Sequence, residues 1–132
     1  EVVESVISKT GASTSYAKVA DGSGLSLYNY VTPSLHVAML RYAYHHEHIF
    51  NHLYACLPIA GVDGTLENRM TSGAAYRNVH AKTGTVTGVS ALTGYIVASN
   101  GHLLAFSIII NGNRTAAEGR AFQDRVCEVL AE

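Results

Sequence analysis

The fold is decided by residues 79–111, which read VHAKTGTVTGVSALTGYIVASNGHLLAFSIIIN. They divide into three strand-length segments, at about residues 79–85, 89–98 and 102–111. Between the last two segments, Ser99-Asn100-Gly101 sets Asn beside Gly, which is a strong signal for a hairpin turn. The pattern predicts three consecutive strands of an antiparallel sheet.

The sequence before these strands predicts two helices and one short strand. Residues 1–9 have the pattern of a helix end, and residues 16–20 that of a short strand. Thr32-Pro33 begins a second helix, because Thr can cap it and Pro lacks only an N–H that would be unpaired there. Its apolar stripe continues to Pro58, with a break expected near residues 45–48.

A last helix is expected after the strands. Thr115 and Glu118 have the spacing of a capping box. The apolar face of this helix is expected to comprise Phe122, Val126, Val129 and Leu130. The order of elements predicts an α+β fold in which an antiparallel sheet is flanked by helices, and residues 1–132 suit a single domain.

Composition excludes several classes of protein. About half of the residues are apolar (48%) and 14% are charged, which argues against a disordered chain or a coiled coil. The net charge is −1 and no basic face is evident, so nucleic acid is not an expected partner. The longest apolar run, 103–110, is interrupted by Ser107 and is of strand length, so no transmembrane segment is expected in this chain. Cys56 and Cys127 allow either one disulfide or two free thiols.

The chemistry is expected at Lys82-Thr83-Gly84, followed by Thr85. In penicillin-binding enzymes, a Lys-Thr-Gly triplet lies on a strand at the margin of the active site. By that pattern, Lys82 supplies positive charge and helps proton transfer at a serine, while the Thr83 hydroxyl bonds a substrate carboxylate. Gly84 leaves room for the substrate, and the Thr85 N–H contributes to an oxyanion hole.

Two further blocks accompany the triplet. They are Asp21-Gly22-Ser23-Gly24-Leu25-Ser26 with Asn29, and residues 57–66, LPIAGVDGTL. In order and spacing, the three blocks resemble the D-alanyl-D-alanine carboxypeptidase/endopeptidase family of low-molecular-mass penicillin-binding proteins. The resemblance covers nearly the whole chain.

The resemblance implies the C-terminal part of a β-lactamase/transpeptidase-like fold in a periplasmic or otherwise exported protein. The implied substrates are peptidoglycan stem peptides, with β-lactams as further ligands and no metal or organic cofactor. Since the chain opens inside a helical pattern and has no initial Met, we expect it to be a piece of a longer protein.

Two other motifs of such enzymes are not in place. Ser-x-Asn does not occur, and Ser15-Tyr16-Ala17-Lys18 matches Ser-x-x-Lys in a segment that does not have the pattern of a helix start. The nucleophile is therefore expected upstream of Glu1, and this fragment is expected to be inactive alone.

The substrate pocket is expected to depart from part of the family. Some members carry Arg directly after Gly-Leu-Ser, where it binds the free carboxylate of diaminopimelate. Here that position is Leu27, which cannot pair with a carboxylate. Thr87 matches a second position that faces the substrate and can offer a neutral hydrogen bond.

The histidines favour structural roles. His48 and His52 are four residues apart, but no His-Glu-x-x-His occurs, so exposed helix positions are expected rather than a metal site. His80 is expected to pack or hydrogen-bond, and Asp21 and Asp63 to form turns. Two other functions stay open: a non-catalytic peptidoglycan- or partner-binding module with the same fold, and a β-lactamase.

Overall fold

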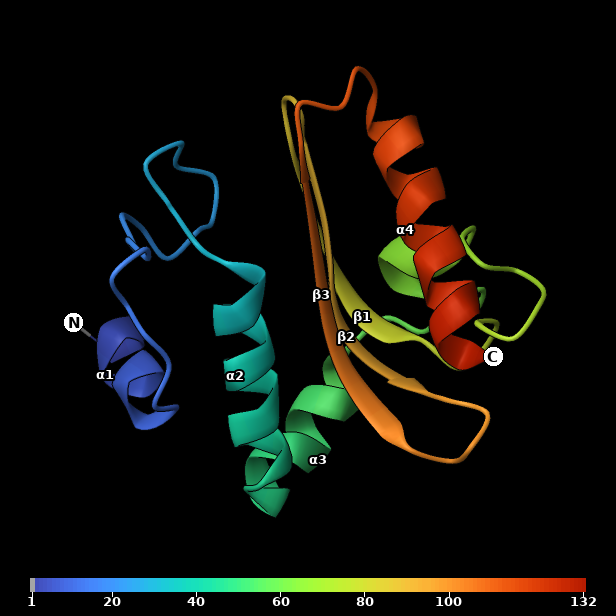
Figure 1. Ribbon diagram of the computed structural model, residues 1–132, viewed down its shortest axis with the longest axis horizontal. Helices are drawn as coiled ribbons and strands as arrows, with labels where there is room; N and C mark the ends of the chain where they lie inside the picture. The colour runs from blue at the N-terminus through green and yellow to red at the C-terminus, as the bar shows by residue number, and fades with distance from the viewer. Residues whose placement is uncertain (1) are drawn as a thin grey trace.

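Three antiparallel strands form the centre of the fold in a computed structural model that describes residues 2–132 (Figure 1). They are β1 (His80–Val86), β2 (Val89–Val97) and β3 (Leu103–Asn111), in the order β1-β2-β3. The expected boundaries hold to within one residue, and Gly101 turns the second hairpin with φ of 83°.

Helices cover both faces of the sheet, as Figure 1 shows. One face packs against α2 (Pro33–Tyr44) and α3 (Glu47–Cys56), and the other against α4 (Ala116–Ala131). The shorter α1 (Val2–Lys9) lies on the outer side of α2. Within residues 2–132 the architecture is therefore α+β, with four α-helices and one three-stranded sheet, as the sequence predicts.

The helix starts follow the capping signals. Thr32 accepts a hydrogen bond from the Leu35 N–H at 3.2 Å, and Thr115 accepts one from the Glu118 N–H at 3.2 Å. The expected break in the long helical stripe is confirmed, since α2 and α3 are separate helices.

One expectation about the elements is wrong, and a second is only partly right. Residues 16–20 form no strand; of these, Lys18 alone makes a β-bridge, to Tyr30, because the segment is largely exposed and has no neighbouring sheet to extend. On α4, Leu130 of the expected apolar face packs against the core and Val126 is partly buried, but Phe122 and Val129 are 48% and 69% exposed. The buried face of that helix is made instead by Gly119, Gln123, Cys127 and Ala131.

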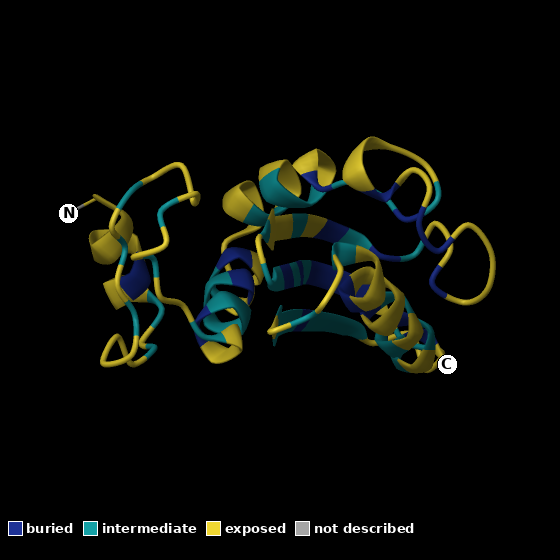
Figure 2. Cartoon of the chain, turned by 90° about the horizontal axis from the view of Figure 1, so that it is seen from above, coloured by how far each residue is buried: buried dark blue, intermediate teal, exposed yellow. Residues whose placement is uncertain are grey.

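The main core lies between the sheet and α4 (Figure 2). Leu92 and Ile96 of β2 are fully buried there, together with Leu66 and Val79 from the loop region before β1. Cys127 packs in the same cluster, and both cysteines are free, with Cys56 exposed. Burial raises the pKa of the Cys127 thiol to about 12, so this thiol stays protonated at neutral pH.

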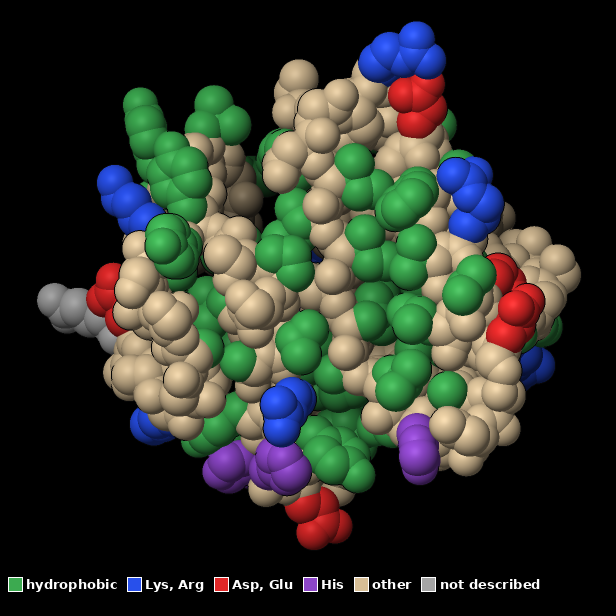
Figure 3. Space-filling model, in the orientation of Figure 1, with side chains coloured by type: hydrophobic (Ala, Val, Ile, Leu, Met, Phe, Trp, Pro, Cys, Tyr) green, Lys and Arg blue, Asp and Glu red, His purple; other side chains and the backbone are tan. Residues whose placement is uncertain are grey.

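The outer edge of β3 is open. Within residues 2–132, β2 is the strand that pairs with β3, and the nine residues of β3 include no charged side chain and no proline. Hydrophobic side chains gather in a band over this strand between α2 and α4 (Figure 3).

A buried ion pair ties α4 to the loop before β1. The Arg69 Nη2 lies 2.6 Å from the Asp124 Oδ1, and the side chains are 9% and 28% exposed. The same guanidinium donates to the Gln123 Oε1 at 3.1 Å, and Gln123 donates in turn to the Ser90 hydroxyl of β2. The network therefore joins loop, helix and sheet.

We expect Asp124→Ala to lower the free energy of unfolding by roughly 3 kcal/mol, because it leaves a buried guanidinium without its carboxylate. Arg114→Ala is the matched control. Its pair with Glu118 is 87% and 49% exposed, so this variant should change stability by less than about 0.5 kcal/mol. Denaturant unfolding measures both, and equal effects would contradict the expectation.

Candidate active site

Lys82, Thr83 and Gly84 lie on β1, the opposite edge strand of the sheet. Lys82 and Gly84 are exposed and Thr83 is half-buried. The Lys82 Nζ donates to the Thr83 carbonyl oxygen at 2.7 Å, which uses one of its three hydrogens. The edge position leaves the ammonium accessible from outside the sheet.

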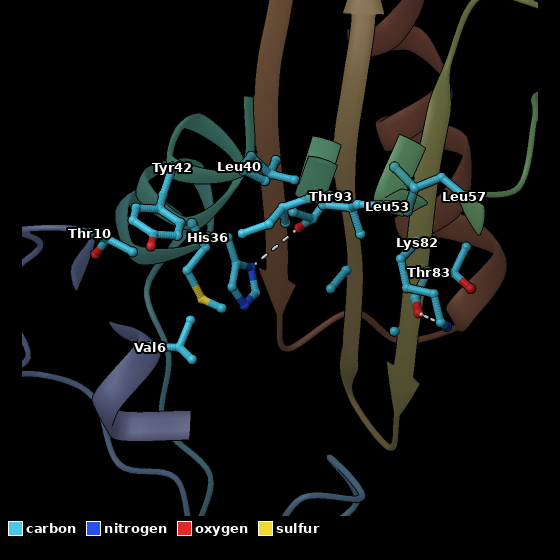
Figure 4. A pocket seen from close by; sticks show the side chains of 15 residues that line it. Val6, Thr10, His36, Leu40, Tyr42, Leu53, Leu57, Lys82, Thr83 and Thr93 are labelled. Carbon is cyan, nitrogen blue, oxygen red and sulfur yellow. Dashed lines mark hydrogen bonds between the residues drawn. The ribbon is translucent and has the colours of Figure 1, made fainter. Parts of the chain in front are cut away.

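The three residues line one cavity of about 430 Å³, between the sheet and α1, α2 and α3. Most of its wall is apolar and includes Met39, Leu53 and Leu57. Figure 4 shows Lys82 on one side of this cavity and His36 of α2 on the other. The cavity therefore presents a few polar groups on an otherwise hydrophobic surface.

The hydroxyl of Thr83 has a partner that the sequence did not single out. It donates at 3.0 Å to the hydroxyl of Thr65, which lies in the short 3-10 helix Gly64–Leu66. Thr65 belongs to the loop that Asp63 shapes by accepting a hydrogen bond from the Ile59 N–H at 2.7 Å. The turn role expected of Asp63 is therefore confirmed.

Thr85, Thr87 and Leu27 do not line this cavity. Thr85 and Thr87 are exposed at the end of β1 and in the turn after it. Leu27 is 79% exposed in the loop that precedes α2.

Asp21 organises the Leu27 loop. Its carboxylate accepts hydrogen bonds from the Gly24 N–H at 3.0 Å and from the Asn29 side chain at 2.9 Å. Chiefly because of the Asn29 hydrogen bond, the pKa of Asp21 lies below its usual value. This matches the turn role expected for Asp21.

A polar cluster on the cavity side of the sheet was missed at the sequence level. The Thr93 and Ser107 hydroxyls lie 2.8 Å apart, and the His36 Nδ1 lies 3.1 Å from Ser107 and 3.3 Å from Thr93. The only sequence signal is one hydroxyl residue in the middle of each of two apolar strands. Nothing in the sequence indicates that His36 lies above both.

His80 has the packing role expected of it. Its ring stacks on Tyr54 with the centroids 4.1 Å apart and the planes inclined by 15°. Its Nδ1 is buried without a hydrogen-bond partner. Burial lowers the pKa of His80, as it does that of His36.

These two shifts predict acid sensitivity. In the unfolded chain both imidazoles take up protons near pH 6.5, whereas the folded chain takes them up only at lower pH. The unfolded state therefore binds more protons as the pH falls, so stability should decrease from about pH 7 to pH 5. Urea unfolding at several pH values measures this. The double variant His36→Gln, His80→Gln should show a flatter profile, and an unchanged slope would contradict the assignment.

The histidines of α3 form no metal cluster. The rings of His48 and His52 have their centroids 4.6 Å apart, and the His52 Nδ1 contacts the His48 carbonyl oxygen at 2.8 Å. In the part of the chain that the structure describes, no group of three or more His, Cys, Asp or Glu side chains could hold a metal ion. No helix of residues 2–132 is both long enough and apolar enough to cross a membrane.

The fold and the edge-strand motif together are those of the penicillin-binding and β-lactamase class of proteins. A family model described as the D-Ala-D-Ala carboxypeptidase 3 (S13) family matches residues 1–132. The chain belongs to this family.

Relatives of known name agree with this placement. The chain is 40% identical over 115 residues to D-alanyl-D-alanine carboxypeptidase DacB of Haemophilus influenzae, covering 86% of this chain and 24% of that protein. It is 44% identical over 135 residues to a D-alanyl-D-alanine carboxypeptidase of Actinomadura sp., covering 98% and 24%. The chain thus spans about a quarter of the length of these relatives.

Solved structures show the same fold. Penicillin-binding protein 4 (dacB) of Haemophilus influenzae matches with a TM-score of 0.87 at 34% identity, over 98% of this chain and 31% of that one. The TLA-1 extended-spectrum β-lactamase matches with a TM-score of 0.72 at 18% identity, over 98% and 52%. The second likeness shows a shared fold only.

Proposed function

We propose that this chain is the C-terminal part of a serine-type D-Ala-D-Ala carboxypeptidase/endopeptidase that acts on peptidoglycan stem peptides in the periplasm or another exported location. The observation that carries the proposal is the placement of Lys82, Thr83 and Gly84 on an open strand edge beside one cavity. The family match over residues 1–132 supports it.

The proposed reaction is acyl transfer through a serine ester. A serine outside this chain attacks the carbonyl carbon of the penultimate D-Ala, and the C–N bond breaks as the leaving amine takes up a proton. Water then hydrolyses the ester. Neither a metal nor an organic cofactor takes part in these steps.

Each residue of the β1 edge has a proposed role. The Lys82 ammonium assists proton transfer at the serine and attracts the substrate carboxylate, which the Thr83 hydroxyl also binds. Gly84 lets the substrate lie against the strand, and the Thr85 N–H donates to the developing oxyanion. Gly84 suits its role because it is exposed, and a Cβ there would meet only the Ala91 Cβ, at 3.5 Å.

The decisive experiment uses the full-length protein. It is incubated with benzylpenicillin and with a D-Ala-D-Ala stem peptide, and the acylated residue is located by mass spectrometry. We expect D-Ala release and an adduct on a serine of a Ser-x-x-Lys motif outside residues 1–132. No adduct and no release would favour a non-catalytic binding module. Fast penicillin hydrolysis without D-Ala release would favour a β-lactamase.

The Leu27 position gives a specificity prediction. An Arg pairing with a free diaminopimelate carboxylate would contribute on the order of 1.5–3 kcal/mol, which Leu27 cannot supply. We therefore expect kcat/KM values for stem peptides with free and amidated diaminopimelate to differ by less than about tenfold. Leu27→Arg should raise the preference for the free carboxylate.

Leu25→Arg is the matched control for this test, because Leu25 is similarly exposed (72%) in the same loop. It should leave the preference unchanged. If the unaltered protein already prefers the free carboxylate by about a hundredfold, another cationic side chain binds this carboxylate. The role given to Leu27 and Thr87 is then wrong.

A further inference from the structure

A polar row crosses the cavity side of the sheet. The strand register places Lys82 opposite Thr93, and Thr93 opposite Ser107, so one side chain from each strand lies at the same level. Residues that are direct partners in an antiparallel sheet point to the same face, and their Cβ atoms lie about 4.5–5.5 Å apart. The neighbouring partners on this face, Ala91 and Ile109, are apolar.

His36 of α2 lies over the sheet and contacts two members of the row, Thr93 and Ser107. Its Nδ1 lies within 3.3 Å of both hydroxyls, and Figure 4 shows the contact with Thr93 as a dashed line. His36, Thr93 and Lys82 all line the same cavity. Because burial lowers the pKa of His36, its imidazole is neutral at neutral pH.

Counting hydrogens selects one tautomer of His36. If the proton is on Nε2, Nδ1 accepts one hydroxyl hydrogen, and the other hydroxyl hydrogen bridges Thr93 and Ser107. If the proton is on Nδ1, that nitrogen cannot accept, so one hydroxyl hydrogen has no acceptor inside the triangle. The Nε2–H form therefore satisfies more of the hydrogen-bonding groups of this partly buried cluster.

The Nε2–H form has a consequence for Thr93. Its hydroxyl hydrogen is used inside the triangle, so what remains on its oxygen is a lone pair, which can only accept. The next side chain along the row is Lys82, whose ammonium has two hydrogens beyond the one given to Thr83. In the structure the ammonium lies at the Thr83 carbonyl (Figure 4), and a different rotamer of Lys82 would bring this donor to the Thr93 acceptor.

We propose that Thr93 is a positioning residue that accepts a hydrogen bond from the Lys82 ammonium, and that His36 and Ser107 fix its hydroxyl in the accepting orientation. This inference rests on the proposed function, in which Lys82 assists acyl transfer. The Thr93 hydroxyl would be a second hydrogen-bond acceptor for the Lys82 ammonium, on the cavity side, in addition to the Thr83 carbonyl. Chains of hydrogen bonds that run in one direction strengthen one another, which favours a fixed lysine.

The test compares hydroxyl loss with hydroxyl retention in the full-length protein. Thr93→Val keeps the shape but removes the acceptor, and Thr93→Ser keeps the acceptor. We expect Thr93→Val to slow the acylation step with benzylpenicillin about tenfold or more with little change in the initial binding constant, and Thr93→Ser to restore most of the rate. Thr71→Val, at an exposed loop position, is the control and should leave the rate unchanged.

His36 is tested separately through its tautomer. Long-range ¹⁵N–¹H spectra of protein labelled at histidine, assigned with His36→Gln, report which ring nitrogen carries the proton. We expect Nε2–H. His36→Gln, whose amide oxygen can still accept, should retain more acylation activity than His36→Leu. An Nδ1–H tautomer, or equal rates for Thr93→Val and Thr93→Ser, would overturn the proposal.

Failure of this inference can be told from failure of the proposed function. If Lys82→Ala slows acylation but Thr93→Val does not, the function stands and the positioning role is wrong. If Lys82→Ala has no effect, the proposed function of the edge strand is itself wrong. Thermal denaturation of each variant shows that rates are compared between folded proteins.

Discussion

Replacing Lys82 with alanine in the full-length protein is expected to slow acylation by benzylpenicillin by about 10²–10³-fold while the protein stays folded. The effect is large because the ammonium acts on charge that develops in the transition state. Stability should change little, since the side chain is exposed on a strand edge and its hydrogen bond is to the Thr83 carbonyl of its own strand. Rapid-quench measurement of the covalent adduct follows the rate.

Lys18→Ala is the matched control, because Lys18 is also an exposed lysine on an extended segment, and it lies outside the cavity. It should acylate at the rate of the unaltered protein. A Lys82→Ala variant that is folded and acylates normally would remove Lys82 from the mechanism.

Gly94→Ala is expected to destabilise the fold about as much as Asp124→Ala does. Gly94 is buried in β2 opposite Ala81, and a Cβ there would overlap the His80 carbonyl oxygen and lie 2.6 Å from the Ala81 Cα. These are backbone atoms, so relief requires β1 to move away from β2. We expect a loss of about 3 kcal/mol of stability, measured by denaturant unfolding.

Alanine substitutions at two other glycines serve as comparisons for this result. Gly22→Ala should be neutral, because a Cβ there meets nothing within 4 Å. Gly84→Ala should also leave the fold intact, but it should slow acyl transfer because it narrows the substrate's path along β1. If Gly94→Ala unfolds no more easily than Gly22→Ala, the tight pairing of β1 and β2 is not as described.

The sheet could be predicted from the sequence because its signals are local. Alternating and continuous apolar runs separated by Gly-containing turns predicted strands at about residues 79–85, 89–98 and 102–111, each within one residue of the observed bounds. The edge position of Lys82-Thr83-Gly84 followed from the motif. The same local reasoning wrongly predicted a strand at residues 16–20, where only Lys18 forms a β-bridge, to Tyr30.

What could not be predicted depends on tertiary contacts. Phe122 and Val129 are exposed, so the apolar stripe of α4 does not predict which side of the helix packs on the sheet. The buried side includes Gly119, which allows close approach, and Gln123, which hydrogen-bonds Ser90. Similarly, His36 meets residues 57 and 71 positions away in the chain. No spacing rule connects residues so far apart.

The open edge of β3 has a practical consequence for handling this chain. Nine uncharged residues present a row of unpaired N–H and C=O groups, without the lysines, prolines or bulges that usually keep such edges from pairing with other molecules. In isolation, this strand is a template for intermolecular sheet formation. Spectroscopy on the 132-residue chain alone therefore calls for dilute samples, and light scattering will show whether association sets in as the concentration rises.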